Sequence, residues 1–456
     1  MSYGALAYLR RQYLCVLRRC AFLNAMSGWL LLAAPAAMAA QPPIVTDGRT
    51  ATTLSHAGAV TDITTATVRG SNAFNSFTRF NIGAGQTVNL HLPQQTANLL
   101  NLVRNERSHI DGVMNAYKDG RIGGNVFFFN PHGMVVGAQG QINVGTLTVA
   151  TPTPAYMERL IGPGGAIDEA AVDQALRGEI PLSESGLITV KGSVRAARAV
   201  QLAAASVNID GGARIDAGAA AHAGFGALVN IDGLDAGAQM LQDGDTVRIV
   251  AADAVNIAGA VSADGAAGEA AGRVRIDAGG NITVADGGRV SADGHGANSD
   301  GGAIRIWAED TATLAQGGEL SARGGEVSGD GGHIEFSATE TVRLEGGELK
   351  ANAVDGQRGA VLIDPNNIEA VINNTHTDGA DFTLIANDTI TVENNITIST
   401  RDIANPTSGD HASDASQGDS GDLTLRASHV ELKAGSRLLA HADNGHATGD
   451  VTVEGR

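Results

Sequence analysis

A block of about 30 residues repeats along the second half of the chain, and this repeat limits the possible folds more than any other feature. Each copy carries a short segment in which apolar and polar residues alternate after a glycine. Successive copies begin 30, 30 and 27 residues apart, at 272–276, 302–306, 332–336 and 359–363. Alternation with a period of two residues is typical of a strand that buries one face.

Two further short segments follow in each repeat. The second has apolar residues two positions apart, and the third comes directly after a Gly-Gly pair. The second segments lie at 282–284, 312–314 and 342–344, the third at 290–292, 320–322 and 349–351, and the glycine pairs at 287–288, 317–318 and 346–347. Glycine supplies the positive φ that a tight corner requires. Three stacked strands in each repeat predict an all-β chain, a right-handed parallel β-helix (solenoid). A compact β-sandwich is the alternative, but it does not explain the repeat.

The composition agrees with a narrow core of small side chains. Glycine accounts for 60 of the 456 residues, aromatic residues for 4% and hydrophobic residues for 43%. This much apolar material argues against disorder over most of the chain. The formal net charge is −18, from 49 acidic and 31 basic residues. We therefore expect no nucleic-acid partner, because such a partner requires a basic surface, and no electrostatic docking on anionic lipid.

Residues 1–40 have the pattern of an export signal. A basic region that includes Arg18 and Arg19 precedes a short apolar stretch at 29–34 and a small-residue site. We predict a signal peptide that is cleaved after Ala39 or Ala40 and read by the Sec export machinery. An uncleaved N-terminal anchor and a twin-arginine signal are the alternatives. Both cysteines, Cys15 and Cys20, fall inside this segment, so the exported chain is expected to use no disulfides.

Two segments depart from the repeat. Between residues 154 and 182, stretches at 155–161 and 166–176 have apolar residues at helical spacing, and the second has acids in its first turn. We predict a short helical insertion there, lying on the β-helix. Residues 400–421 are rich in Asp, Ser, Gly and Ala and are predicted to form a mobile loop.

The N-terminal part of the predicted mature chain carries an ordered series of segments. They lie at 71–80, 82–93, 100–104, 108–112, 126–137 and 141–147, and the pattern continues weakly at 186–192 and 200–204. In order and spacing they resemble the secretion domain of two-partner-secreted exoproteins, the filamentous-haemagglutinin family. The resemblance covers about a third of the chain well. It implies a β-helical module that is presented to an outer-membrane transporter, whose periplasmic domains recognise the exoprotein.

The most specific segment of this series contains the turn Asn130-Pro131-His132-Gly133. The family has asparagine at the third position, where this chain has histidine, while its other asparagine-proline turn has no clear match here. Asn130 is expected to bond backbone donors, Pro131 to fix φ, and Gly133 to take a left-handed corner. We predict that these four residues form the secretion motif recognised by the transporter. The alternative is that they only close a corner of the β-helix.

No constellation of residues predicts catalysis. Parallel β-helices also include polysaccharide-acting enzymes, whose sites need converging carboxylates and sugar-stacking aromatics. The candidate acids lie mostly in glycine-rich turns, where we expect solvated turn formers; they are Asp264, Asp293, Asp300, Asp330 and Glu335. The histidines lack metal-ligand spacing; those considered are His91, His109, His132, His222, His295 and His333. Gly/Asp turns at 299–302 and 329–332 resemble pieces of calcium-binding nonapeptides, but their spacing favours turn chemistry. We expect no enzyme, no cofactor and no metal site.

The predicted organisation is a signal peptide at 1–40, a two-partner-secretion, haemagglutination-type domain at 41–210 and a repeat β-helix at 211–456. The resemblance implies adhesion or haemolysin-type action. We expect a secreted or surface-exposed, outer-membrane-associated adhesin that binds an unidentified receptor on host or neighbouring cells. A membrane-damaging haemolysin and, less favoured, a polysaccharide-acting enzyme remain alternatives. The chain is short for a fibrous adhesin, and it ends in a strand-like segment, 451–453. Two interpretations stay open: the chain is a truncated copy, or its end pairs with another chain.

Overall fold

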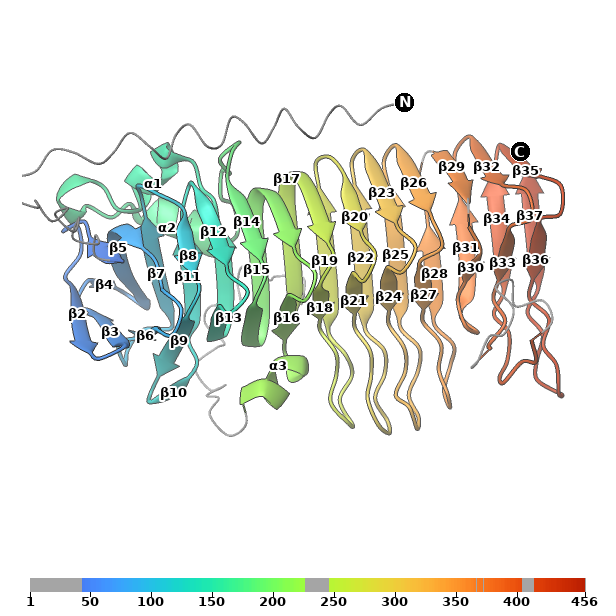
Figure 1. Ribbon diagram of the computed structural model, residues 1–456, viewed down its shortest axis with the longest axis horizontal. Coiled ribbons are helices and arrows are strands. Elements are labelled where there is room, and N and C mark those ends of the chain that lie inside the picture. The colour runs from blue at the N-terminus through green and yellow to red at the C-terminus, as the bar shows by residue number, and fades with distance from the viewer. Residues whose placement is uncertain (1–42, 226–245, 366, 372, 404–413, 456) are drawn as a thin grey trace, which may run out of the picture. The chain divides into compact units, whose positions relative to one another are not determined.

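The computed structural model describes residues 43–225, 246–365, 367–371, 373–403 and 414–455, which lie in one compact unit, Pro43–Arg456. The predicted signal peptide at 1–40 lies outside the described residues. Nearly all strands of the unit pair in parallel with the equivalent strand of the coil before and the coil after (Figure 1). The chain is therefore a parallel β-helix, as the repeat predicts.

Three ladders of strands make up the three sides of each coil. The first ladder consists of β5 (Asn72–Phe80), β7 (Asn98–Val103), β11 (Asn125–Phe129), β13 (Gln141–Ala150), β15 (Ser193–Ile209), β17 (Val247–Ile257), β19 (Arg273–Ala278), β22 (Ala303–Ala308), β25 (His333–Ala338), β28 (Ala360–Ile363), β31 (Asp381–Ile385), β34 (Leu423–Ala427) and β37 (Val451–Gly455). The long strands β13, β15 and β17 turn corners and so contribute to more than one ladder.

The other two ladders use shorter strands. The second consists of β8 (Ser108–Ile110), β12 (Gly133–Val136), β14 (Leu187–Val190), the ends of β15 and β17, β20 (Ile282–Val284), β23 (Thr311–Leu314), β26 (Thr341–Leu344), β29 (Asn367–Val371), β32 (Thr389–Val392) and β35 (His429–Leu432). The third consists of β3 (Val60–Thr65), β6 (Thr87–His91), β9 (Val113–Lys118), the beginnings of β13 and β15, β16 (Arg214–Ala217), β18 (Ala260–Ser262), β21 (Arg289–Ser291), β24 (Glu319–Ser321) and β27 (Glu348–Lys350). After β27, a separate three-stranded sheet contains β30 (Thr375–His376), β33 (Thr397–Ser399) and β36 (Arg437–Leu439).

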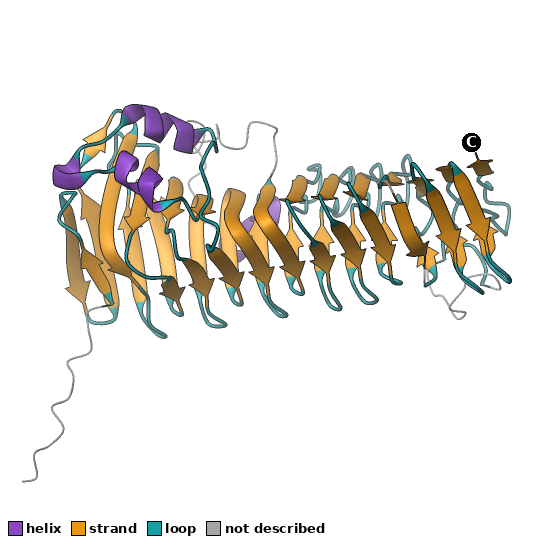
Figure 2. Ribbon diagram, turned by 90° about the horizontal axis from the view of Figure 1, so that it is seen from above, coloured by secondary structure: helices purple, strands orange, loops and turns teal. Residues whose placement is uncertain are grey.

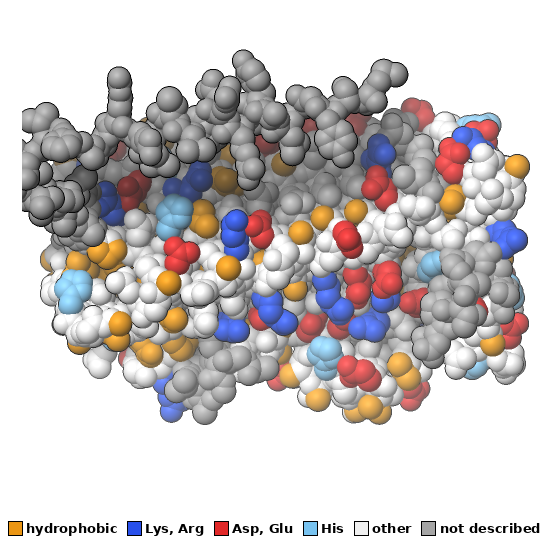
Figure 3. Space-filling view, viewed as in Figure 1, with side chains coloured by type: hydrophobic (Ala, Val, Ile, Leu, Met, Phe, Trp, Pro, Cys, Tyr) orange, Lys and Arg blue, Asp and Glu red, His pale blue; other side chains and the backbone are white. Residues whose placement is uncertain are grey.

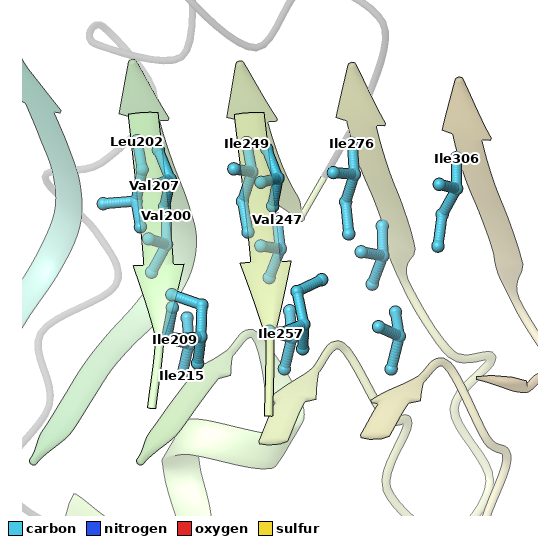
Figure 4. Packing of buried hydrophobic residues seen from close by; sticks show 14 of the residues in the cluster. Val200, Leu202, Val207, Ile209, Ile215, Val247, Ile249, Ile257, Ile276 and Ile306 are labelled. Atoms are coloured by element: carbon cyan, nitrogen blue, oxygen red, sulfur yellow. The ribbon is translucent and has the colours of Figure 1, made fainter. Parts of the chain in front are cut away.

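The register of the strands accounts for the sequence repeat. Ile276 pairs with Ile306, which pairs with Phe336, so equivalent residues stack directly on one another. Figure 4 shows Ile249, Ile276 and Ile306 forming one such row of side chains. These side chains are fully buried in a core that continues from Ile44 to Ala440. The first glycine of each predicted pair takes a left-handed φ, 75° at Gly287 and 81° at Gly317, which confirms the predicted corners.

Antiparallel strands cover the N-terminal end of the ladders. β1 (Ile44–Thr46) and β4 (Val68–Arg69) pair antiparallel with β5, and β2 (Thr52–Ala57) forms a hairpin with β3. A short strand β10 (Arg121–Ile122) pairs antiparallel with β9. An uncovered parallel ladder would present a row of unpaired backbone groups, and the antiparallel strands occupy that edge.

The helical insertion lies where the sequence predicts it. It contains α1 (Pro154–Leu160), the 3₁₀ turn η1 (Pro163–Gly165) and α2 (Glu169–Leu176). Thr153 caps α1, and the Asp168 side chain accepts the backbone N–H groups of Ala170 and Ala171 at the start of α2. The helices cover one side of the first coils (Figure 2). A further helix, α3 (Ala219–Phe225), has no counterpart in the sequence predictions.

The insertion covers strands that are apolar on both faces. Phe74, Leu100 and Phe127 point away from the main core and are buried in a second cluster with Tyr156 and Leu160 of α1. The Tyr156 hydroxyl donates to the Ala171 carbonyl at 2.7 Å, which joins the two helices. Fully burying a large apolar side chain contributes about 1.5–3 kcal/mol, so this cluster fixes the helices on the β-helix.

Candidate functional site

The predicted motif forms the corner between β11 and β12, and Asn130 is its buried anchor. The Asn130 side chain is fully buried. Its Nδ2 donates to the Glu106 carbonyl at 2.8 Å and to Ser108 Oγ at 3.1 Å, and its Oδ1 accepts the His132 N–H at 2.9 Å. Its backbone N–H donates to the Ala150 carbonyl at 3.1 Å. Asn130 therefore connects its own coil to the coil before and to the coil after.

The other three residues complete the corner in different ways. Pro131 is buried, and the Gly133 N–H closes the turn on the Asn130 carbonyl at 2.9 Å. Gly133 has a φ of 95°, and a Cβ placed there would lie 1.9 Å from the Leu187 carbonyl oxygen of the next coil. His132 is exposed, with Nε2 3.1 Å from the Arg104 carbonyl oxygen, and its own carbonyl accepts Arg107 Nε at 3.0 Å. The turn thus presents one exposed side chain on a rigid support.

A cluster of ion pairs lies beside this turn, and the sequence analysis missed it. Arg104 Nε donates to Asp47 Oδ2 at 3.0 Å, and its Nη1 donates to Glu158 Oε1 at 3.0 Å. Arg49 reaches the same glutamate at 2.7 Å, and both arginines donate to the Ile161 carbonyl. The cluster joins the loop between β1 and β2, the coil that supports the turn and helix α1.

Burial changes the electrostatics of this cluster. The Arg104 side chain is only 10% exposed, and this burial, with the nearby Arg49, lowers the pKa of Arg104 below its usual value. The hydrogen bond from Arg49, followed by the charge of Arg104, holds the pKa of Glu158 below its usual value. Two arginines and two carboxylates balance in charge, so ordering the cluster does not leave a buried charge without a partner. No local pattern could reveal it, because Asp47 and Arg104 are 57 residues apart.

The predicted turn acids do not converge on one point. The Asp300 carboxylate accepts the Asp330 N–H, and the Asp330 carboxylate accepts the Gln357 N–H, so each links its loop to the next. Glu335 pairs with Arg305 at 3.1 Å. Asp293 was expected to be a solvated turn former, and this is wrong. It is only 1% exposed and is bonded by Arg289 of its own coil and by Ser321 and Arg323 of the next coil.

The predicted histidines are likewise dispersed; besides His132, whose partner is the Arg104 carbonyl, three have a carboxylate or carbonyl partner among the described residues. His91 lies 2.8 Å from Asp62 Oδ1, and His222 Nε2 lies 2.8 Å from the Ala197 carbonyl. His295 Nδ1 lies 2.9 Å from Glu326 Oε1 of the next coil. Within the described part of the chain, no three metal-ligating side chains gather in one place. Acidic and basic side chains are intermixed on the visible face (Figure 3), which agrees with ion pairs between neighbouring coils.

The pair between His295 and Glu326 gives a testable pH dependence. Hydrogen bonds from the Gly296 N–H and from His295 lower the pKa of Glu326 to about 2, and the hydrogen bond to Glu326 raises the pKa of His295. The charged imidazole therefore stabilises the folded chain below its unfolded pKa, and this contribution is lost as the pH rises through the raised folded pKa. We expect Glu326→Gln to lower the pKa of His295, measured by NMR titration of the imidazole protons.

The control for that titration is Glu269→Gln, which removes the same charge from an exposed position on the neighbouring loop. The His295 titration is expected to be unchanged in this variant. An equal shift in both variants would mean that the general negative field of the loops, and not the pair, sets the pKa of His295.

No helix among the described residues has the length and apolar character needed to cross a membrane. No curated protein sequence matches the chain. Among solved structures, the chain is similar to the HMW1 secretion domain from Haemophilus influenzae, at 13% identity and a TM-score of 0.41, covering 87% of this chain and 98% of that chain.

A family model for the TPS secretion domain matches residues 43–284. The match begins next to the predicted signal peptide and includes the turn at 130–133 and the helical insertion. It also extends beyond residue 210, so the predicted domain boundary stays a prediction. Because the model covers more than half of the 456 residues, the chain belongs to the family of exoproteins exported by two-partner secretion, in which an outer-membrane transporter is the partner.

Proposed function

We propose that the corner at 130–133 is the element of this exoprotein that its outer-membrane transporter recognises, after Sec-dependent export through a signal peptide at 1–40. The observation that supports this is the combination of a buried anchor and an exposed side chain. Asn130 has its donors and its Oδ1 acceptor bound within the protein, whereas His132 lies at the surface. A rigid corner that presents one polar side chain suits recognition by a protein partner, because little conformational entropy is lost on binding.

A second contribution to recognition is the edge of the N-terminal hairpin. Among the described strands, β2 pairs with β3 alone, and most of its residues are exposed. Its unpaired backbone groups are suited to strand addition by the periplasmic domains of the transporter. In this proposal the hairpin supplies general backbone pairing, and the corner supplies specificity.

The variant His132→Ala separates recognition from folding. Within the described part of the chain the side chain makes one polar contact, with the Arg104 carbonyl, so the folded chain is expected to lose no more than about 1 kcal/mol of stability. We expect the fraction of the chain that reaches the medium to fall several-fold when the transporter is present. Immunoblots of periplasm and medium measure this fraction, and circular dichroism of the purified variant measures stability.

The matched control is His109→Ala, an exposed histidine on the preceding coil. Its secretion is expected to match that of the unchanged chain. If His132→Ala is also secreted normally, the corner acts only through folding and the transporter reads another surface.

We further propose that the exported chain acts at the cell surface as an adhesin. The helices α1 and α2 bury their apolar side chains against the β-helix, so they are not available as membrane-active helices. The described candidate acids are bound to arginines or to backbone N–H groups of adjacent loops, which favours a structural role for them over catalysis. Binding of the purified chain to cells, together with absence of red-cell lysis and of activity on acidic glycans, is the expected result. Lysis or dye release from liposomes would favour the haemolysin alternative.

A further inference from the structure

The short segment after β7 supports the corner at 130–133 through two backbone carbonyls. Arg104 is the first residue after β7, and its carbonyl accepts a hydrogen bond from His132 Nε2 at 3.1 Å. Two residues further on, the Glu106 carbonyl accepts Asn130 Nδ2 at 2.8 Å. The exposed side chain and the buried anchor of the corner therefore both depend on the position of this segment.

The bond to the Arg104 carbonyl also determines what the imidazole of His132 offers to a partner. A carbonyl oxygen can only accept, so His132 Nε2 carries the proton of this bond. In the neutral imidazole the other ring nitrogen, Nδ1, is then an acceptor. An acceptor held on a rigid corner suits an N–H or O–H donor of a protein partner.

The side chain of Arg104 is held from two sides and is only 10% exposed. On one side, its Nε donates to Asp47 Oδ2 at 3.0 Å, and Ser76 Oγ donates to the same oxygen at 2.6 Å. On the other side, its Nη1 donates to Glu158 Oε1 at 3.0 Å and its Nη2 donates to the Ile161 carbonyl at 2.6 Å. Ile161 is the C-cap residue of α1, and a helix C-terminus favours a cation. The guanidinium is therefore fixed by the helical insertion as well as by the N-terminal loop.

We propose that Arg104 is a positioning residue for recognition by the transporter, an inference that rests on the proposed function of the corner at 130–133. When α1 docks, its C-terminal end holds the guanidinium, and the backbone carbonyl of the same residue is thereby held against His132. Without α1, the guanidinium loses its bonds to Glu158 and to the Ile161 carbonyl, and the segment that carries the carbonyl is less restrained. The transporter then recognises a corner whose geometry depends on the helical insertion being in place.

Nitrogen-15 NMR of the imidazoles in the full exported chain tests the positioning directly. At pH 8.5, where an ordinary imidazole is neutral, we expect well-separated Nδ1 and Nε2 shifts for His132, because one ring nitrogen carries the proton. The signals of this residue are assigned by their absence in His132→Ala. Glu158→Gln is expected to narrow the separation, because a less restrained ring exchanges between its two tautomers, and Arg104→Met is expected to narrow it further.

The same variants connect the positioning of the ring to export. We expect the secreted fraction to fall about twofold to threefold in Glu158→Gln, the effect of one partly exposed ion pair, and further in Arg104→Met. Glu158 is 46% exposed, so its variant is expected to fold even if Arg104→Met does not, and circular dichroism checks this. The matched control is Glu179→Gln, which removes the same charge from an exposed pair with Arg177 after α2. Its imidazole spectrum and its secretion are expected to be unchanged.

Three results would overturn the positioning role of Arg104. The first is an imidazole spectrum that is unchanged in Glu158→Gln, and the second is an equal change in Glu179→Gln. The third is a changed spectrum with normal secretion, because the transporter would then not read the ring that Arg104 positions. Failure of the proposed function gives a different result, normal secretion of His132→Ala. That result removes the recognition step, whereas the spectrum still decides whether Arg104 positions the ring.

Discussion

The variant Gly133→Ala is expected to prevent both folding of the N-terminal coils and export. Gly133 has a φ of 95°, and a Cβ there would lie 1.9 Å from the Leu187 carbonyl oxygen, inside the pairing of β12 with β14. The coil that contains Leu187 would have to move away, which breaks the ladder at this point. We expect a loss of about 3 kcal/mol or more, from backbone strain plus lost pairing, measured by denaturant unfolding.

The matched control is Gly85→Ala. Gly85 has a similar φ of 74°, but a Cβ there would have no atom within 4 Å. This variant carries the backbone strain alone, about 1 kcal/mol, and should still be exported. If the two variants lost equal stability, the close approach of Leu187 would not be the reason for glycine at position 133.

The variant Arg401→Met is expected to unfold the last coils while leaving the earlier ones intact. Arg401 is only 1% exposed. Its guanidinium donates to the Asp414 carbonyl at 2.7 Å, to the His441 carbonyl at 3.1 Å and to Asp443 Oδ2 at 2.5 Å. Methionine removes the donor from two backbone carbonyls and from a carboxylate whose side chain is 44% exposed, which we expect to cost about 1–3 kcal/mol.

Hydrogen exchange measures where that stability is lost. Each coil of a solenoid contacts mainly its neighbours, so protection should fall in β33, β34 and β36 and stay unchanged in β19 and β22. The control is Arg426→Met, whose pair with Glu454 is 2.6 Å long but exposed, and which should cost less than about 1 kcal/mol. A uniform loss of protection along the chain after Arg401→Met would contradict the local role of Arg401.

The β-helix could be predicted from the sequence, because the register between stacked strands requires residues of the same type to recur at a fixed spacing. Stacking Ile276 on Ile306 and Phe336 requires the same residue type at the same spacing, and the glycine corners recur with it. The helical insertion could also be predicted, from apolar residues at helical spacing and from acids in the first turn, where Glu169 lies in α2.

Features that depend on packing between distant segments could not be predicted in this way. One exception is the covering of β7 and β11 by the helical insertion. A strand that is buried on both faces loses the alternation of apolar and polar residues, and the mostly apolar sequences of these two strands show that loss. The Arg104 cluster and the burial of Asp293 had no such signal, since Asp47 is 57 residues from Arg104 and Arg323 reaches Asp293 from the next coil. Arg401 lies in a segment predicted to be a mobile loop. Residues 404–413 of that segment lie outside the described residues, whereas the flanking Ser416 and Ser420 are buried.

The candidate site shows the same division between local and distant information. The residues of the corner at 130–133 could be identified from one short segment, and their predicted roles as a bonded asparagine and a left-handed glycine are confirmed. The hydrogen bonds that join Asn130 to the coil before and to the coil after could not be predicted from that segment, because the partners are distant in sequence.

The most direct test of the account is whether export depends on an outer-membrane transporter. Cells that express the chain with a C-terminal tag, with and without the co-expressed transporter, are separated into periplasm, outer membrane and medium, and the tag is measured in each fraction. We expect the chain to stay in the periplasm without the transporter and to reach the surface or the medium with it. Equal arrival at the surface in its absence would contradict the proposed route.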